Sequence, residues 1–281
     1  MLLNNRIAPG YKQLFHAIRI KYVSARQPVT FRHLHLLREL IRRDFHARFT
    51  GSALGVFWAV LQPVLLVVLY WFVFTFMFSR AIPASGHDDY VYYLISGLIP
   101  WLAIAEGLTR STTAIVENGP MVRRLSLRSE LLVIVPNASA IIFECVAFAI
   151  FIVFLIAKGA LPRMVWMLPV ALVLQFSLQL GFGLILAASY VFFRDLTQIL
   201  GFMLSIIFYL SPILYAVPAR FKALLIWNPL TPLLGLFRGA VLSQALPDVG
   251  SIVFLLAACS AIFVAGLFFF RRAEPVLVDL V

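Results

Sequence analysis

The stretch RRDFHARFTGSALGVFWAVLQPVLLVVLYWFVFTFMFS, residues 42–79, decides the fold. Its first seven residues hold four charged side chains and a histidine, whereas the 31 residues from Phe49 to Ser79 hold no charge. At about 1.5 Å per residue, such a run is longer than the roughly 30 Å hydrocarbon core of a bilayer. The junction therefore predicts a polar helix that leads into a membrane span.

The composition extends this interpretation to the whole chain. Of its 281 residues, 62% are hydrophobic and 12% are charged, whereas a soluble domain has about 25% charged residues. Nearly uncharged blocks lie at 55–78, 91–113, 131–157, 164–193, 196–217 and 249–270. They predict an all-α integral membrane protein with six transmembrane helices. The net charge of +11 indicates cytoplasmic flanks rather than a nucleic-acid partner, because no basic stripe alternates with aromatic residues.

The distribution of basic residues predicts the orientation. With both termini inside, the inner segments hold 17 Lys and Arg residues and the outer segments hold 6. Most of this excess comes from the N-terminal region, and it follows the positive-inside rule. We expect a multi-pass protein of the cytoplasmic (inner) membrane, with a cytoplasmic arm at 1–29 and a cytoplasmic tail at 273–281.

Two further segments flank or interrupt the predicted transmembrane domain at 51–272. Residues 30–50 alternate apolar and basic residues at helical spacing, which predicts an amphipathic helix in the membrane interface. Residues 218–248 contain a 15-residue uncharged run, broken by prolines, that is too short to span. A re-entrant helical hairpin on the outer side fits this region, and one more irregular span is the alternative.

The inner segment VENGPMVRRLSLRSELL, residues 116–132, has two interpretations. The breaker at Asn118-Gly119-Pro120 could precede a short basic helix that contacts a soluble partner. An ordinary positive-inside loop explains the same residues, and the pattern does not decide between them.

Catalytic motifs are scarce. The sequence has no G-x-x-x-x-G-K-S/T for nucleotide phosphates and no H-E-x-x-H for zinc. Asp88-Asp89 resembles the metal-binding loop of a polyprenyl-phosphate glycosyltransferase, although a solvated turn is the simpler interpretation. Glu106 and Arg110 have the spacing of an ion pair along one helix. Glu144 lies in the third predicted span, so it must be protonated, paired across helices or exposed to water.

Aromatic residues are dense in the first predicted span. Trp58, Tyr70, Trp71 and Phe74 could stack on sugar rings along a carbohydrate path. Packing against lipid or neighbouring helices is the alternative for each of them.

Over residues 31–272 the chain resembles the membrane subunits of ABC-2-type exporters that move lipid-linked polysaccharides such as O-antigen, capsule or teichoic acid. The resemblance rests on RRDFHARFTGSALGVFWAVLQP with Gly55, Trp58 and Pro63, on FFRDL at 192–196, on LSPILY at 210–215 followed by Pro218, and on Asn228-Pro229 followed by Arg238. One departure is Leu127-Arg128-Ser129-Glu130, which lacks the proline of the family's Phe-Pro-x-Glu turn.

The resemblance implies that the helix at 31–49 and a coupling helix near 118–130 contact a separate ATP-binding cassette subunit. The residues expected to face that subunit are Arg42, Arg43, Asp44, Asn118, Arg123, Arg124, Leu125 and Glu130. The residues expected to shape the gate and the fold are Pro63, Arg194, Asp195, Ser211, Pro212, Asn228, Pro229 and Arg238. Among these, we expect Asp195 to cap the fifth span and Ser211-Pro212 to bend it toward the hairpin.

The function that follows is export of a polyprenyl-pyrophosphate-linked polysaccharide by a homodimer with two ATPase subunits. This chain would hold no cofactor, while the partner would bind ATP and Mg²⁺. Export of lipids or drugs is one alternative, and a membrane glycosyltransferase is another. Lipid and the glycan are the other expected partners.

Overall fold

The computed structural model describes residues 29–49, 55–58, 87–119, 129–160, 162–215 and 227–280, with residues 61, 64, 65, 68, 69, 72, 73 and 225. The chain divides into two units, residues 1–40 and 41–281. The described part of the first unit is the beginning of α2 (Val29–Phe49). The second unit contains the remainder of α2 and all the other described elements.

Every regular element within these ranges is a helix, which confirms the predicted all-α class for the described part of the chain. After α2 the elements are η1 (Gly55–Phe57), α4 (His87–Glu117), α6 (Glu130–Ala157), η3 (Val165–Met167), α7 (Leu168–Phe192), α8 (Leu196–Leu210), α10 (Leu230–Leu242) and α11 (Val249–Leu280).

Among the described residues, four helical stretches are long and apolar enough to cross a membrane. They are Tyr90–Glu117, Glu130–Ala157, Val165–Phe192 and Val249–Glu274. The fifth predicted span corresponds to α8, whose 15 residues reach only about 22 Å. The first predicted span, 55–78, lies mostly outside the described residues, so the number six stays a prediction. The re-entrant hairpin also stays a prediction, and α10 is the helix that the structure describes within residues 218–248.

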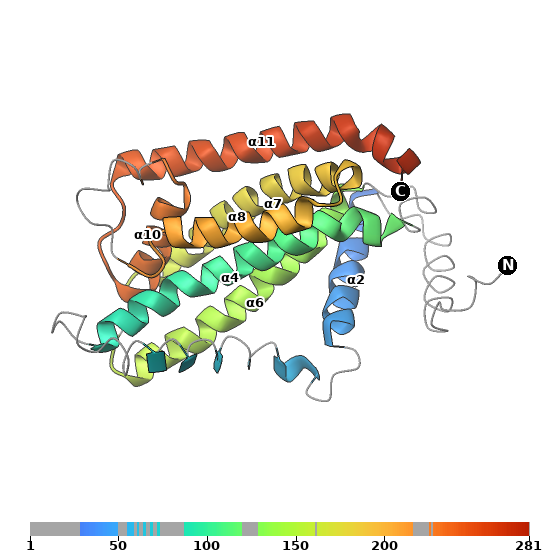
Figure 1. Cartoon of the computed structure of the whole chain (residues 1–281). Helices are drawn as coiled ribbons and strands as arrows, with labels where there is room; N and C mark the ends of the chain where they lie inside the picture. The colour runs from blue at the N-terminus through green and yellow to red at the C-terminus, as the bar shows by residue number, and fades with distance from the viewer. Residues whose placement is uncertain are drawn as a thin grey trace. The chain divides into compact units, whose positions relative to one another are not determined.

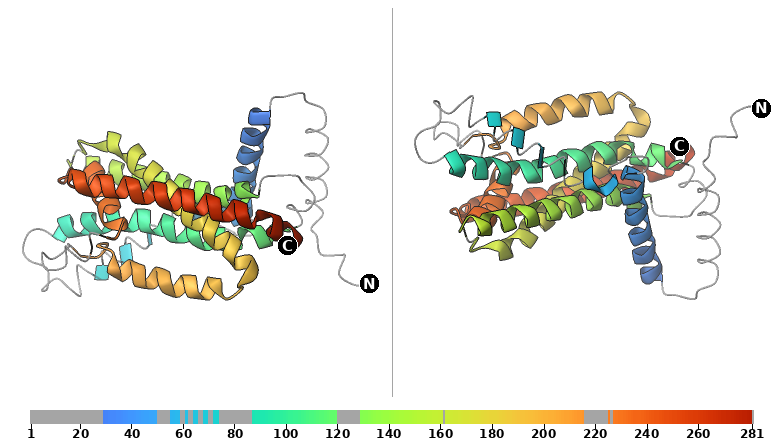
Figure 2. Two further views of the ribbon diagram at one scale, coloured as in Figure 1. Left: turned by 90° about the horizontal axis from the view of Figure 1, so that it is seen from above. Right: turned by 90° about the horizontal axis from the view of Figure 1, so that it is seen from below.

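The four long helices lie side by side in the second unit (Figures 1 and 2). α7 packs against α11 and against α4, and α6 packs against both α4 and α7. The shorter α10 contacts α4 and α7, while α8 contacts α4. Phe148 of α6 stacks on Phe237 of α10 with ring centroids 5.2 Å apart, and both side chains are fully buried. The hydrophobic core therefore includes the short α10 as well as the long helices.

The burial of the long helices runs opposite to their hydropathy. The most apolar segments of α6 and α11 have mean hydropathies of 2.9 and 2.7, yet only 28% and 17% of their residues are buried. The corresponding segment of α4 has a mean hydropathy of 1.5 and is 72% buried. In a water-soluble bundle the most apolar helix would be the most buried. The exposed apolar faces of α6 and α11 thus suit a hydrocarbon environment.

Two glycines allow α7 and α11 to approach closely. A Cβ atom on Gly181 would lie 2.6 Å from the carbonyl oxygen of Ile262, and one on Gly266 would lie 2.2 Å from the carbonyl oxygen of Gly181. Small residues at such crossings are typical of membrane helix pairs, because close backbone contact replaces the hydrophobic driving force that water provides.

The expected bend in the fifth span is instead a helix end. α8 stops at Leu210, and Ser211 is extended with φ −94° and ψ 147°. A proline disfavours helical geometry in the residue before it, and Pro212 has this effect on Ser211. Residues 211–215 then form turns and bends rather than a continuation of the helix.

The expected cap at the start of α8 is also wrong. Asp195 does occupy the N-cap position, but its side chain makes no capping hydrogen bond. Its backbone carbonyl accepts hydrogen bonds from the N–H groups of Gln198 and Ile199 instead. The helix begins there through backbone geometry, and the carboxylate is left free of that role.

Candidate coupling site

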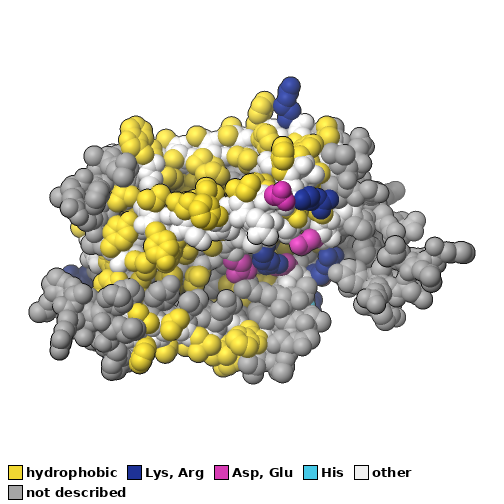
Figure 3. Space-filling view, in the orientation of Figure 1, with side chains coloured by type: hydrophobic (Ala, Val, Ile, Leu, Met, Phe, Trp, Pro, Cys, Tyr) yellow, Lys and Arg dark blue, Asp and Glu magenta, His cyan; other side chains and the backbone are white. Residues whose placement is uncertain are grey.

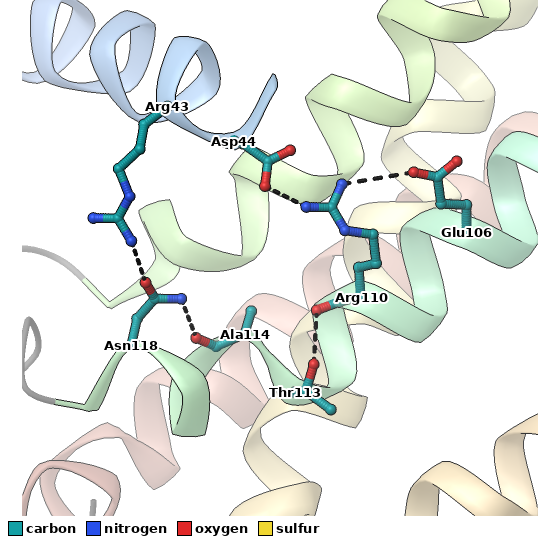
Figure 4. A network of polar contacts seen from close by, with 7 residues as sticks. All are labelled: Arg43, Asp44, Glu106, Arg110, Thr113, Ala114 and Asn118. Atoms are coloured by element: carbon teal, nitrogen blue, oxygen red, sulfur yellow. Dashed lines mark hydrogen bonds and ion pairs between the residues drawn. The ribbon is translucent and has the colours of Figure 1, made fainter. Parts of the chain in front are cut away.

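Charged residues join the end of α2 to α4. The Arg43 side chain donates a hydrogen bond to Oδ1 of Asn118 at 3.2 Å, and Asn118 donates to the carbonyl of Ala114 within its own helix at 2.9 Å (Figure 4). About two turns before Asn118, Arg110 of α4 forms an ion pair with Asp44. Because Arg43 and Asp44 are neighbours, two adjacent residues of α2 contact two different turns of α4.

The Arg110 guanidinium lies between two carboxylates. Its Nη2 contacts Asp44, and its Nη1 lies 3.6 Å from Oε1 of Glu106, the pair that the spacing of four residues predicted. The Arg110 side chain is 33% exposed and that of Asp44 is 16% exposed. Partial burial reduces solvent screening, so this pair is stronger than a fully exposed one. We call Arg43, Asp44, Glu106, Arg110 and Asn118 the charged junction.

An aromatic contact supports the same junction from α6. The rings of Phe45 and Phe143 stack with centroids 4.6 Å apart and an interplanar angle of 27°. Three consecutive residues of α2, Arg43 to Phe45, therefore contact α4 and α6. A displacement of this part of α2 would act on both helices.

A second polar contact ties the beginning of α6 to the last part of α11. Oε1 of Glu130 accepts a hydrogen bond from Nε of Arg271 at 2.8 Å, and the N–H of Ser129 donates to Glu274 at 3.4 Å. Acidic and basic side chains gather toward this end of the face shown in Figure 3, over a surface that is otherwise mostly hydrophobic or uncharged. Among the described residues, these ion pairs therefore lie where α4 ends and α6 begins.

The structure brings together part of the predicted coupling set. Arg43 contacts Asn118, and the adjacent Asp44 contacts Arg110. Glu130 pairs with Arg271 of α11, and Arg42 is exposed on α2. Arg123, Arg124 and Leu125 lie outside the described residues. The predicted coupling segment is therefore anchored at both of its described ends.

Of the four residues predicted to line the substrate path, the structure describes Trp58. Trp58 is 41% exposed and follows η1, in which Phe57 is 58% exposed. Tyr70, Trp71, Phe74 and the structural residue Pro63 lie outside the described residues. The stacking role of these aromatic residues stays a prediction.

The opposite end of the bundle is held by a different kind of contact. Four consecutive backbone carbonyls, those of residues 212–215, accept hydrogen bonds from side chains. Tyr93 donates to Pro212 at 3.4 Å and to Tyr215 at 2.9 Å, Arg238 donates to Ile213 at 3.2 Å, and Tyr90 donates to Leu214 at 2.7 Å. We call this arrangement of Tyr90, Tyr93 and Arg238 around residues 212–215 the carbonyl clamp.

Arg238 is the buried centre of the carbonyl clamp. It is 5% exposed, and its guanidinium carbon lies 3.5 Å from the ring centroid of Tyr93, which is a cation–π contact. Gly97 leaves room for it, because a Cβ atom there would lie 2.7 Å from Nη2 of Arg238. Residues 212–215 form turns and bends rather than a helix, so side-chain donors satisfy their carbonyl groups.

Asn228 joins the carbonyl clamp region to the beginning of α10. Its Oδ1 accepts a hydrogen bond from the N–H of Leu230 at 3.0 Å, and its Nδ2 donates to Oγ of Ser211 at 3.1 Å. Pro229 occupies the N-cap position of α10. The predicted structural residues Ser211, Asn228, Pro229 and Arg238 therefore lie in one neighbourhood, whereas Arg194 lies over the ring of Tyr190 at the far end of α7.

Several contacting residues were not found from the sequence. Asp44 and Arg110 were each considered, but not as a pair, because they are 66 positions apart. Tyr90 and Tyr93 have no predicted role in the sequence analysis, and their spacing of three residues on one helix face is the available signal. Arg271 had no signal beyond its charge.

The comparison with known proteins agrees with this architecture. The ABC-2 type transporter family matches residues 35–242. Two proteins named O-antigen export system permease protein RfbA, from Klebsiella pneumoniae and Myxococcus xanthus, are each 28% identical to this chain. The alignments cover 75% and 85% of this chain and 82% and 93% of these relatives. A polysialic acid transport protein KpsM from Escherichia coli is 24% identical over 253 residues, with 93% of that protein covered. The family match spans most of the chain and confirms the resemblance, so the chain belongs to the membrane proteins of the ABC-2 type transporter family.

Proposed function

We propose that this chain is the transmembrane subunit of an ATP-driven exporter that moves a polyprenyl-pyrophosphate-linked polysaccharide across the cytoplasmic membrane. ABC-2 membership supports a transport role. The sequence contains no phosphate-binding motif, and the proposal therefore gives ATP hydrolysis and Mg²⁺ binding to a separate subunit. The relatives are named for O-antigen and polysialic acid, which are both carbohydrate polymers. Their names favour a glycan over a drug or a membrane lipid as the substrate.

The charged junction is the observation that carries the mechanism. Arg43 and Asp44 hold α2 to α4 through one hydrogen bond and one ion pair, and Phe45 holds it to α6. A force applied to α2 by a partner would pass through these contacts into two of the membrane helices. ATP binding by the partner would thus be converted into movement of the bundle.

The proposal places the charged junction on the cytoplasmic side. This end of the bundle holds Arg110 and Arg271, and the described residues Gly119 and Ser129 lie on either side of the basic segment 120–128, in line with the positive-inside rule. The carbonyl clamp and α10 then face outward, where the hairpin would close the path. Two copies of the chain would form the pore at their shared two-fold axis, because one subunit of this size cannot enclose a polysaccharide.

The test is complementation of a strain that lacks the gene. Loss of this chain should remove the polysaccharide from the cell surface while its lipid-linked precursor accumulates inside, and the intact gene should reverse both changes. The Asp88→Asn/Asp89→Asn variant should restore the surface polymer fully. If the strain instead fails to make the precursor, the chain acts in synthesis and the export function is wrong.

A further inference from the structure

Six polar side chains lie along the shared interior of three membrane helices. They are Ser111 of α4, Asn137, Ser139 and Glu144 of α6, and Gln175 and Gln179 of α7, and each is at most 2% exposed. None of them belongs to the charged junction or the carbonyl clamp. Polar groups at this depth are costly unless they find partners, so their pairing has to be explained.

Most of these side chains bridge two helices. Asn137 donates to Oγ of Ser111 at 2.7 Å, and Gln179 donates to the backbone carbonyl of Ala103 at 3.1 Å. Two glycines make room for the amide groups of Gln179 and Asn137. A Cβ atom on Gly107 would lie 1.8 Å from Nε2 of Gln179, and one on Gly183 would lie 3.1 Å from Nδ2 of Asn137.

Glu144 and Gln175 form the pair between α6 and α7. Gln175 donates to Oε2 of Glu144 at 2.5 Å. The remaining oxygens, Oε1 of Glu144 and Oε1 of Gln175, are both buried and have no hydrogen-bond partner. Each of these two oxygens needs a donor, and neither has one among the described residues.

The charge of an ionised Glu144 would have no compensation. In the described ranges the ion pairs of the second unit join Asp44, Glu106 and Glu130 to arginines, and no cation pairs with Glu144. A carboxylate that is 2% exposed, inside a bundle surrounded by hydrocarbon, would keep one hydrogen bond from a neutral amide. That single bond is far too little to offset the loss of hydration of a full charge.

We propose that Glu144 is a neutral carboxylic acid that forms a ring of two hydrogen bonds with Gln175 and so fixes α6 against α7. The Gln175 N–H donates to one carboxyl oxygen, and the Glu144 O–H donates to the Gln175 carbonyl oxygen. The added proton supplies the missing donor, and both unpartnered oxygens are satisfied at once. The pair holds two helices in register at a depth where water does not compete for the hydrogen bonds.

Infrared difference spectroscopy on the purified full-length chain tests the charge state. The spectrum of the wild type minus that of Glu144→Gln should contain the C=O band of one protonated carboxylic acid. Glu130→Gln is the matched control and should remove carboxylate bands instead, because Glu130 pairs with Arg271. Loss of carboxylate bands in Glu144→Gln would show that Glu144 is ionised and would overturn the proposal.

Thermal unfolding of the same chain tests the ring. Glu144→Gln should unfold at the wild-type temperature, because two amides can form the same pair of hydrogen bonds. Glu144→Leu should unfold at a lower temperature, because the Gln175 amide is left without a partner, and Glu144→Leu/Gln175→Leu should recover most of the loss. If Glu144→Gln lowers the temperature as much as Glu144→Leu does, the ring is wrong.

Discussion

The charged junction and the carbonyl clamp hold the two ends of the same bundle by different means. At the charged junction, side chains pair with side chains, and the Arg110–Asp44 pair is 33% and 16% exposed. In the carbonyl clamp, side chains donate to the backbone of residues 212–215, and Arg238 is 5% exposed. Ion pairs near a surface can separate and re-form at little net cost, whereas buried donors cannot leave unpaired carbonyls behind.

This difference assigns a role to each end. The charged junction suits a contact that transmits movement. Its charged side chains are partly exposed, so water can solvate them when a partner moves away. The carbonyl clamp suits a fixed closure, since opening it leaves the buried Arg238 and the carbonyls of residues 212–215 without their partners. Variants at the charged junction should therefore affect export more than folding, and variants in the carbonyl clamp should affect folding first.

The largest effect is expected for Arg238→Ala. It removes the cation–π contact with Tyr93, the donor to Ile213 and a large buried side chain, which together should cost about 2–4 kcal/mol of folding free energy. Thermal unfolding of the purified protein measures the change. Arg163→Ala is the matched control, because the Arg163 side chain is exposed near the same end of the bundle. Equal stability of the two variants would show that the carbonyl clamp does not stabilise the fold.

Reversing the charges of Asp44 and Arg110 should stop export without unfolding the protein. Asp44→Arg places two cations together, and Arg110→Asp collects three carboxylates with Glu106. The double variant restores one attraction, so we expect a coupling free energy of about 1–2 kcal/mol between the positions. Surface polysaccharide, normalised to the amount of folded protein, is the measurement. Equal loss in the double and single variants would show that the ion pair does not transmit movement.

A smaller effect is expected for Arg43→Ala. It removes one hydrogen bond to Asn118 at a partly exposed site, worth about 0.5–1.5 kcal/mol, so export should fall by a few-fold at most. Arg42→Ala is the control, because it removes the same charge from the adjacent exposed position of α2. The same assay should find a smaller loss of export for Arg42→Ala than for Arg43→Ala. An equal loss would show that the charge, and not the hydrogen bond, is responsible.

The smallest effect concerns the beginning of α11. Asp248 accepts hydrogen bonds from the backbone N–H and the hydroxyl of Ser251, and these bonds lower the pKa of its carboxyl group. The stabilisation is present above the usual carboxyl pKa and is lost as the pH falls through the lowered pKa. Asp248→Asn should slightly reduce the unfolding temperature at neutral pH. The unfolding temperature of this variant should also fall less than that of the wild type when the pH is lowered. Asp195→Asn, which removes no cap, should do neither.

Hydropathy and charge were sufficient to predict the helical class and four of the spans, because long apolar runs have few alternatives in a membrane. The end of α8 at Leu210 was less predictable. Ser211-Pro212 signals a break, but whether a proline bends or ends a helix depends on what satisfies the freed carbonyls. In this protein Tyr90, Tyr93 and Arg238 do so from helices that are distant in sequence.

The sequence was sufficient to predict which residues belong to the candidate site, but not which of them contact one another. The resemblance selected Arg43, Asp44 and Asn118 by position, yet a sequence cannot show that Asp44 pairs with Arg110 across 66 residues. The resemblance also selected Glu130, yet its pair with Arg271, 141 residues away, has no signal in the sequence. Local spacing did succeed for Glu106 and Arg110, since four residues along a helix fix their separation.

The central claim is that the charged junction faces the ATPase subunit. A photo-crosslinking amino acid placed at the exposed position Glu117, one residue before Asn118, tests it most directly in the assembled complex. Illumination should join this chain to the ATPase subunit, and the same amino acid at Ser243, beyond the far end of α10, should not. Capture of the ATPase subunit from Ser243 but not from Glu117 would place the driving force at the carbonyl clamp end and contradict the account.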